Sequence, residues 1–454
     1  MDAKTHRRSQ ISGLFAPQLS GAAEASYWRI KNACLQRYGM RRSSPLKVIP
    51  LIVIILCCTN ANAYAVLTHE ELIDLAWNDS IRPLLLARFP GATDDELVVA
   101  HSYAYGGSAI QDMGYYPFGQ GFFSNLTHYV RSGDFVAWML HNARTLDEYA
   151  FAIGALSHYL GDSIGHSEAI NPATAFEFPK LQHKYGDSVT YGESPHGHIR
   201  TEFAFDVEEL TNLEFAPPAY LRKVGFRVPR VFLEQAFIHT YGFDIRSLLR
   251  RYRAALRSYR TSVRSFLPAF AEAEVVLHRH QFPRHPDDDA YRTFVQRVSR
   301  TNYERRWKHT YKEPGFKAHL LAILVFLVPK IGGASDLAIK IPTPETQDWY
   351  LRSMNHTIDV FNQTLHNLLK DTNTPIALAN LDLDTGKPVR IGDYPLADQT
   401  YAKLLERITS QPGDTIPQDL KQHILKFYGD FPEGHGALFD RLSLIQKMKV
   451  KDSP

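Results

Sequence analysis

The stretch from His158 to His166 carries three side chains that can bind a metal ion, and they are spaced four residues apart. His158, Asp162 and His166 fall on one face of a helix, because residues four apart lie one turn apart. The residues from Tyr149 to Ser157 are mostly apolar or small, and they predict a buried helix. A polar stripe inside such a helix is costly unless its groups are paired or bind metal. The spacing therefore indicates a metal site.

Other histidines and acids extend the set of candidate ligands. They are His69, Asp112, His128, His198 and Glu202. His198 and Glu202 are again four residues apart, which predicts a second one-face pair on a helix. His183 and His196 compete with His198, but only His198 has an acid four residues later. The last cysteine is Cys58, so any metal beyond it must be held by nitrogen and oxygen ligands, which suit zinc and harder cations.

The order of these residues resembles that of the zinc-dependent phospholipase C family. That family is related to the S1/P1 nucleases and to the N-terminal domain of glycosylphosphatidylinositol-specific phospholipase D. The likeness covers approximately Tyr64 to Asp206. It implies a nearly all-helical domain, a cluster of three zinc ions, and hydrolysis of a phosphoester. It also implies that the N-terminal residue of the mature protein binds metal through its amine and carbonyl groups.

The resemblance implies a ligand set for each zinc ion. The first ion would be held by Asp112, His128, His158 and Asp162. Asp162 would bridge to a second ion, which His69 and the terminal amine of Tyr64 complete. The third ion would be held by His166, His198 and Glu202.

This sequence departs from the family pattern at two places. Residue 64 is Tyr, where the family usually has Trp, a change that a backbone ligand tolerates. The gap between Asp162 and His166 is shorter than in the bacterial lipases and nucleases, and it is closer to the phospholipase D branch.

Asp112 is the candidate catalytic residue, as a zinc ligand that can also act as a base toward the attacking water. Aromatic residues follow it, and those that could contact substrate are Tyr115, Tyr116, Phe122 and Phe123. They could form an apolar lip for a lipid or a shelf on which a nucleic-acid base stacks. Packing within the loop is the alternative interpretation.

Three functions remain compatible with this pattern. We expect a zinc-dependent phosphoester hydrolase that resembles phospholipase C and acts on a phospholipid or another phosphodiester. The same cluster would also serve a nuclease, because loops rather than ligands select the substrate. A non-catalytic surface protein stabilised by metal is the third possibility, in which metal removal would unfold the chain.

The N-terminal region predicts export. A basic segment from Met40 precedes the apolar run Val48–Cys58, and cleavage after Ala63 would leave Tyr64 as the new N-terminus. We therefore expect residues 40–63 to be a signal peptide and the mature protein to be periplasmic or extracellular. Residues 1–39 are interpreted as a mis-called extension. An uncleaved N-terminal anchor is the alternative.

The rest of the chain predicts an all-α protein. Of its 454 residues 44% are hydrophobic and 22% charged, and its net charge of +3 is too small to argue for nucleic acid. We expect a helical domain over 64–340 and a C-terminal helical region of unknown role over 341–454. Helices are expected at 68–88, 93–105, 134–144, 146–170, 229–241, 244–266, 290–312, 346–370, 397–408 and 418–429, with a loop-rich segment at 171–197. No alternation of period two predicts a sheet.

Four further segments invite a functional interpretation. Arginines repeat on one helical face from Arg246 to Arg264, which could bind anionic headgroups or nucleic-acid phosphates, or could simply be solvated. The apolar run Ala318–Val328 predicts a buried helix, with contact at a membrane surface as the alternative. The loop 380–386 is rich in oxygen ligands and weakly resembles a calcium loop. The His/Asp cluster at 278–289 is interpreted as an exposed loop.

Overall fold

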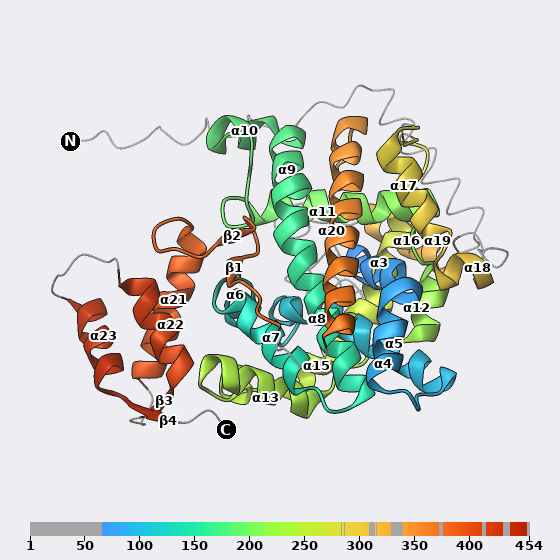
Figure 1. Cartoon of the computed structure of the whole chain (residues 1–454). Helices are drawn as coiled ribbons and strands as arrows, with labels where there is room; N and C mark the ends of the chain where they lie inside the picture. The colour runs from blue at the N-terminus through green and yellow to red at the C-terminus, as the bar shows by residue number, and fades with distance from the viewer. Residues whose placement is uncertain are drawn as a thin grey trace, which may run out of the picture. The chain divides into compact units, whose positions relative to one another are not determined.

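The computed structural model of the protein describes residues 66–282, 284–285, 287–307, 314, 316–327, 339–371, 376–410, 415–429 and 436–451. Residues 1–39, the expected signal peptide and Tyr64 lie outside the described residues. The described part is mostly helical, which confirms the all-α fold class (Figure 1).

The first part of the chain builds the elements that surround the candidate site. In chain order they are α3 (Val66–Ala76), a π-helical turn η2 (Trp77–Ile81), α4 (Arg82–Arg88), α5 (Asp94–Ser108), a 3₁₀ helix η3 (Ile110–Tyr115), α6 (Gly121–Tyr129), α7 (Ser132–Asn142), α8 (Leu146–Gly165), a π-helical turn η4 (His166–Ile170), α9 (Asn171–Glu177), α10 (Pro179–Tyr185) and α11 (Pro195–Thr211).

The later elements are also mainly helices. They are α12 (Pro218–Val224), α13 (Arg230–Tyr241), α14 (Ile245–Leu248), α15 (Tyr252–Thr261), a π-helical turn η5 (Ser262–Phe266), α16 (Leu267–His278), α17 (Asp289–Val298), α18 (Asn302–Trp307), α19 (Phe316–Leu327), α20 (Pro344–Lys370), α21 (Pro395–Thr409), α22 (Gln418–Tyr428) and α23 (Ala437–Lys447).

Helix α8 is the central element, as its apolar sequence predicts. Thr145 and Glu148 form a reciprocal capping box at its start, which satisfies backbone donors that would otherwise lack partners. α8 packs along α5 at very close range. A Cβ on Gly107 would lie 2.0 Å from the Phe151 carbonyl oxygen, so only glycine permits this crossing.

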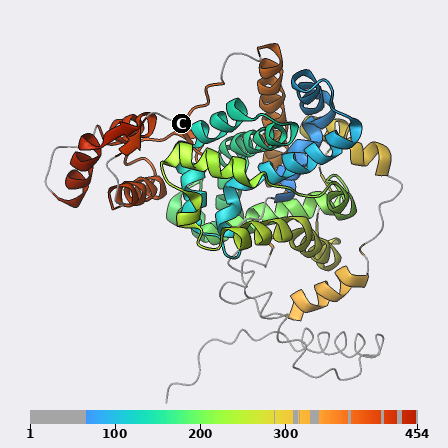
Figure 2. The same cartoon turned by 90° about the horizontal axis from the view of Figure 1, so that it is seen from below.

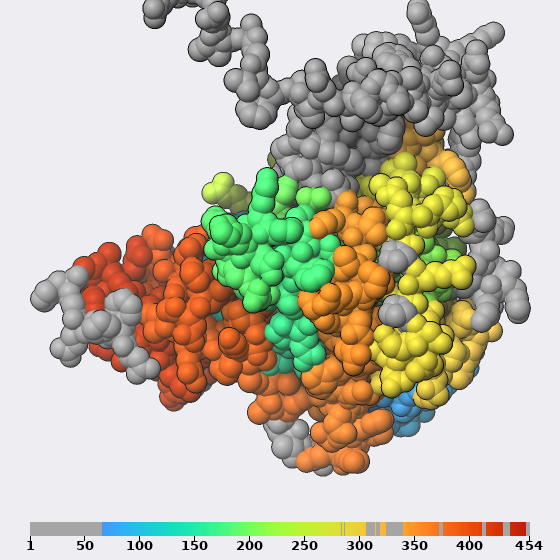
Figure 3. Space-filling view, turned by 90° about the horizontal axis from the view of Figure 1, so that it is seen from above, coloured from blue at the N-terminus to red at the C-terminus, as the bar shows by residue number. Residues whose placement is uncertain are grey.

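Helix α20 covers α8 from the C-terminal part of the chain. Figure 1 shows the two helices side by side, and they pack against each other. In the space-filling view α20 (orange) lies between the green α9–α10 segment and the yellow α17 (Figure 3). Thr343 caps α20, which begins two residues before the start expected from the sequence. The Tyr350 hydroxyl lies 2.8 Å from Thr68 Oγ1, which ties α20 to α3.

Helices α21, α22 and α23 are drawn in red in Figure 2. α21 and α22 each pack against α23, and α21 also packs against α6. Four short strands accompany the C-terminal region. β1 (Leu381–Asp382) pairs antiparallel with β2 (Lys387–Pro388), and β3 (Thr415–Pro417) pairs parallel with β4 (Lys449–Lys451). Strands of two or three residues are too short to show a period-two pattern, so they could not be predicted from the sequence.

Several expected helix boundaries are wrong, and the structure supplies the reasons. Thr68 does not begin its helix, because Val66, the first described residue, is already helical. The distant Asp206 accepts hydrogen bonds from the Leu67 and Thr68 amides. α7 begins at Ser132 rather than at Asp134, after Arg131 in a left-handed conformation.

Other segments differ from the expected helices as well. Residues 171–185 are helical rather than loop-like, since Pro172 and Pro179 stand at the first turns of α9 and α10. The helix expected at 244–266 is interrupted between α14 and α15, and the one expected at 290–312 is divided into α17 and α18. The final helix α23 was not expected.

The apolar run at 318–328 forms α19 and packs against α16. Ala318 and Ala322 are buried, whereas Leu320 is 40% exposed. No helix among the described residues is long and apolar enough to cross a membrane.

Candidate metal centre

Six elements bring the candidate ligands together. His158 and Asp162 lie on α8, and His166 begins the π-helical turn that follows. π-Helical turns recur at functional sites in helices. His69 lies on α3, Asp112 on η3 and His128 on α6, and both His198 and Glu202 lie on α11. All eight candidate ligands that the structure describes therefore converge.

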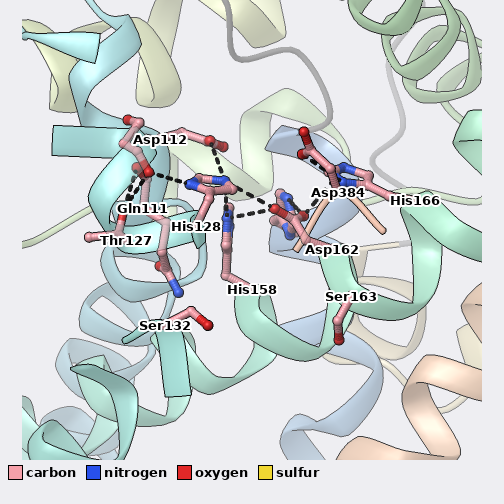
Figure 4. A network of polar contacts seen from close by, with 12 residues as sticks. Gln111, Asp112, Thr127, His128, Ser132, His158, Asp162, Ser163, His166 and Asp384 are labelled. Atoms are coloured by element: carbon pink, nitrogen blue, oxygen red, sulfur yellow. Dashed lines mark hydrogen bonds and ion pairs between the residues drawn. The ribbon is translucent and has the colours of Figure 1, made fainter. Parts of the chain in front are cut away.

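Asp162 lies at the centre of this cluster, with its two carboxylate oxygens facing different histidines (Figure 4). Oδ2 lies 3.0 Å from His158 Nε2 and 3.2 Å from His128 Nε2. Oδ1 lies 3.2 Å from His69 Nε2 and 3.7 Å from His166 Nε2. One buried carboxylate thus separates two pairs of imidazole nitrogens, which is the arrangement of a bridging ligand.

The two ends of the cluster each contain a further carboxylate. Asp112 Oδ1 lies 3.4 Å from His128 Nε2. At the other end, Glu202 Oε1 lies 3.1 Å from His166 Nε2 and 3.2 Å from His198 Nε2. Three groups of nitrogen and oxygen donors, two of which share His158, therefore lie close enough together to hold an ion each.

Backbone contacts fix the orientation of two central histidines. His128 Nδ1 lies 2.8 Å from the Ser124 carbonyl oxygen, and His158 Nδ1 lies 2.9 Å from that of Ser108. Each Nδ1 must donate to its carbonyl, which directs Nε2 into the cluster. The two Nε2 atoms lie only 3.4 Å apart, a close approach that a metal ion between them and Asp162 would explain.

The electrostatics of the cluster fit cation binding. Burial by itself raises the pKa of a carboxyl group, yet the facing histidines hold the pKa of Asp162 well below its usual value and lower that of Glu202 to about 2. Burial lowers the pKa of His128, but its bonds to Asp112 and Asp162 outweigh this effect and raise it to about 10. Without metal, protons on the histidines would balance the carboxylates, and metal ions can replace those protons.

Asp384 is a site residue that sequence reasoning did not assign. It lies in the loop expected to resemble a calcium site, and its Oδ1 is 3.6 Å from His166 Nδ1 (Figure 4). The Tyr129 hydroxyl donates to Oδ2 at 2.9 Å, Tyr394 also donates to it, and Asn171 Nδ2 donates to the Asp384 carbonyl. The oxygen-rich composition of the loop was the only sequence signal, and it did not reveal the partner.

The aromatic residues after Asp112 divide between the site and the core. Tyr115 faces the cluster, with its ring 6.3 Å from that of His128. Tyr116 and Phe123 are buried against Tyr259 and Phe237. Phe122 is half-buried in a groove, which it shares with α21 residues such as Lys403 and Arg407.

Tyr191 was not expected at the site. Its ring lies 5.9 Å from that of Tyr115 and 5.7 Å from that of His198. The competing histidines are placed differently: His198 is buried in the cluster, whereas His183 and His196 are exposed. A small pocket lies on the other side of the cluster, between α3, α8 and α20, and His69, Asp162 and Glu202 contribute to its wall.

Comparison with protein families agrees with this geometry. Residues 68–242 match the family described as zinc dependent phospholipase C. Residues 68–242 form a segment of the zinc-dependent phospholipase C family. Comparisons with curated proteins and with solved structures gave no match. The match includes all eight described candidate ligands and ends long before Asp384, so the contact with His166 comes from a part of the chain outside the zinc-dependent phospholipase C segment.

The donor set fits zinc. Histidine nitrogens and carboxylate oxygens are its usual ligands where cysteine is absent. His69 and His198 each leave Nδ1 without a hydrogen-bond partner among the described residues, and His166 Nδ1 lies 3.6 Å from Asp384 Oδ1, while the Nε2 atoms of all three face the cluster. Similarity to this family over residues 68–242 implies phosphoesterase activity and zinc as the metal.

Proposed function

We propose that the protein is an exported, zinc-dependent phosphoester hydrolase of the phospholipase C type. The observation that carries this proposal is Asp162, which presents each of its oxygens to a different pair of histidines. A carboxylate in that position suits two adjacent cations, and adjacent cations suit displacement at phosphorus.

The residues would divide among three zinc ions. Asp112, His128, His158 and Asp162 would hold the first. His69 and Asp162 would hold the second, with the terminal amine of Tyr64 if the leader is cleaved after Ala63. His166, His198 and Glu202 would hold the third. Bound zinc lowers the pKa of coordinated water and stabilises negative charge on phosphoryl oxygens.

The protein itself would orient the histidine ligands and supply a base for the attacking water. Ser124 and Ser108 fix the rings of His128 and His158 through their carbonyls. Asp112 has the most exposed side chain of the carboxylates around Asp162, at 14%, and among the described residues it forms an ion pair only with His128. It can therefore accept a proton from the attacking water and orient it toward phosphorus.

The surroundings of the cluster support a lipid substrate. Tyr115 and Tyr191 stand beside the ligands and offer amphipathic rings to an acyl-glycerol or a headgroup. Arg253 and Arg257 project from α15 into solvent, which would favour contact with an anionic membrane surface. The same two tyrosines could stack on a nucleic-acid base, so a nuclease is the second candidate.

A substrate panel tests the proposal. Zinc-loaded protein produced from Met40 should release phosphocholine from phosphatidylcholine, and chelation should abolish the release. Faster cleavage of single-stranded DNA would favour the nuclease. Hydrolysis of neither, with unfolding on chelation, would contradict the proposal and favour a structural metal site.

A further inference from the structure

A second group of buried ligands lies away from the proposed active site. Glu209 is near the end of α11, Glu214 follows in the next turn, and His285 belongs to the connection between α16 and α17. The expectation of an exposed loop is wrong for His285, because its side chain is only 1% exposed. The reason is that Glu209 and Glu214 draw the imidazole into the protein interior.

The distances in this group are those of ligands around one ion. His285 Nε2 lies 3.3 Å from Glu209 Oε1 and 3.4 Å from Glu214 Oε2. Neither contact has hydrogen-bond geometry, and a single N–H could not serve both oxygens in any case. Donors around tetrahedral zinc lie about 3.3 to 3.5 Å apart, given its usual bond lengths.

The charge of the group also calls for a cation. Glu208 and Glu209 are fully buried, and none of their carboxylate oxygens has a hydrogen-bond partner among the described residues. Among the residues that the structure describes, no lysine or arginine forms an ion pair with Glu209 or Glu214. One imidazole therefore faces several carboxylates in a setting where uncompensated charge is costly.

We propose that Glu209, Glu214 and His285 bind one divalent transition-metal ion, with zinc as the expected occupant. A donor set of one imidazole and two carboxylates suits zinc better than calcium, which prefers oxygen ligands alone. We refer to these three residues as the Glu209 site. It is separate from the three zinc positions proposed above, and none of its ligands belongs to them.

The position of the Glu209 site indicates a structural role. Glu202 and Glu209 are seven residues apart on α11, so they lie on one face at a separation of about 10 Å along the axis. An ion at Glu209 would fasten the α16–α17 connection to the helix that carries His198 and Glu202. It would thereby hold those two ligands in place from a distance.

Anomalous diffraction from crystals of the unmodified zinc-loaded protein tests this inference directly. Data above the zinc edge should show a peak between Glu209, Glu214 and His285, besides peaks around Asp162. Peaks around Asp162 with none at the Glu209 site would overturn the inference and leave the proposed function standing. Absence of peaks at both places would contradict both.

Variants provide a second test in solution. Glu209→Gln and His285→Ala should each lower the zinc content by about one ion per chain and lower the unfolding temperature. His278→Ala is the matched control, because His278 Nε2 also lies 3.2 Å from a buried carboxylate oxygen, that of Glu274. Unchanged zinc content in both Glu209 site variants would refute the inference. Phosphocholine release, measured on the same samples, reports separately on the Asp162 cluster.

Discussion

Asp384 Oδ1 lies 3.6 Å from His166 Nδ1, although Asp384 is far outside the family segment that contains the histidine. Burial raises the pKa of a carboxyl group, but the contacts with His166 lower that of Asp384 below its usual value. An ionised carboxylate behind a metal-binding histidine fixes its ring and increases its basicity. The C-terminal region therefore supports the proposed third zinc position from outside the family domain.

Replacement of Asp384 should weaken zinc binding. We predict that Asp384→Asn lowers zinc affinity or hydrolytic rate by about 10- to 100-fold, as is typical when the partner of a ligating histidine is lost. The fold should persist, since Tyr129 and Tyr394 can still donate to the remaining side-chain oxygen. The exposed Asp393→Asn in the same loop region is the control. Equal zinc affinity in the two variants would show that Asp384 does not support His166.

Asp112 should matter for rate more than for folding. We predict that Asp112→Asn lowers phosphoester hydrolysis by at least about 100-fold, because the attacking water loses its base and orienting group. The unfolding temperature should change little, since the Asp112 side chain is partly exposed and among the described residues forms an ion pair only with His128. Rate measurements at saturating zinc, with thermal unfolding in parallel, would check this. Full activity in the variant would remove Asp112 from the mechanism.

The zinc-free protein should become less stable as the pH rises. Bonds to Asp112 and Asp162 overcome the effect of burial and place the pKa of His128 at about 10 in the fold, against about 6.5 when unfolded. A pKa raised by folding gives stability that is complete below the unfolded value and is lost as the pH rises through the folded value. Burial also raises the pKa of Asp206 to about 7, which contributes in the same direction.

Thermal unfolding checks this dependence. For chelated protein, the unfolding temperature should fall between pH 6.5 and 10. For zinc-loaded protein it should rise between about pH 5 and 7, since protons then compete with zinc for the histidines. A flat profile for chelated protein would argue against proton-stabilised ligands in the empty cluster.

The arginines of α15 should promote binding to membranes. Arg253 and Arg257 are exposed, and no acid of the described chain forms an ion pair with either. Reversal of both charges should weaken binding to vesicles that contain anionic lipid by at least about tenfold, with hydrolysis of a soluble phosphodiester unchanged. Vesicle co-sedimentation of Arg253→Glu/Arg257→Glu measures this effect. If reversal of the exposed Arg144 and Lys370 has the same effect, the contribution is not specific to α15.

The sequence predicted the candidate site better than it predicted the boundaries of the elements. The four-residue spacing of His158, Asp162 and His166 is a local property of a helix, so it could be read directly. The contacts of the first turn of α3 could not be predicted, because the Leu67 and Thr68 amides donate to Asp206, which is distant in the sequence. The roles of Asp384 and His285 depend on contacts between segments far apart in the chain, which no local pattern encodes.

The zinc content of Asp162→Ala tests the central claim most directly. Asp162 faces both histidine pairs, so its removal should cost about two of the roughly three zinc ions expected around it and abolish hydrolysis. Plasma mass spectrometry on wild type and variant, purified identically after cleavage of the leader, gives this difference. A variant that keeps the zinc content of the wild type would contradict a cluster bridged by Asp162.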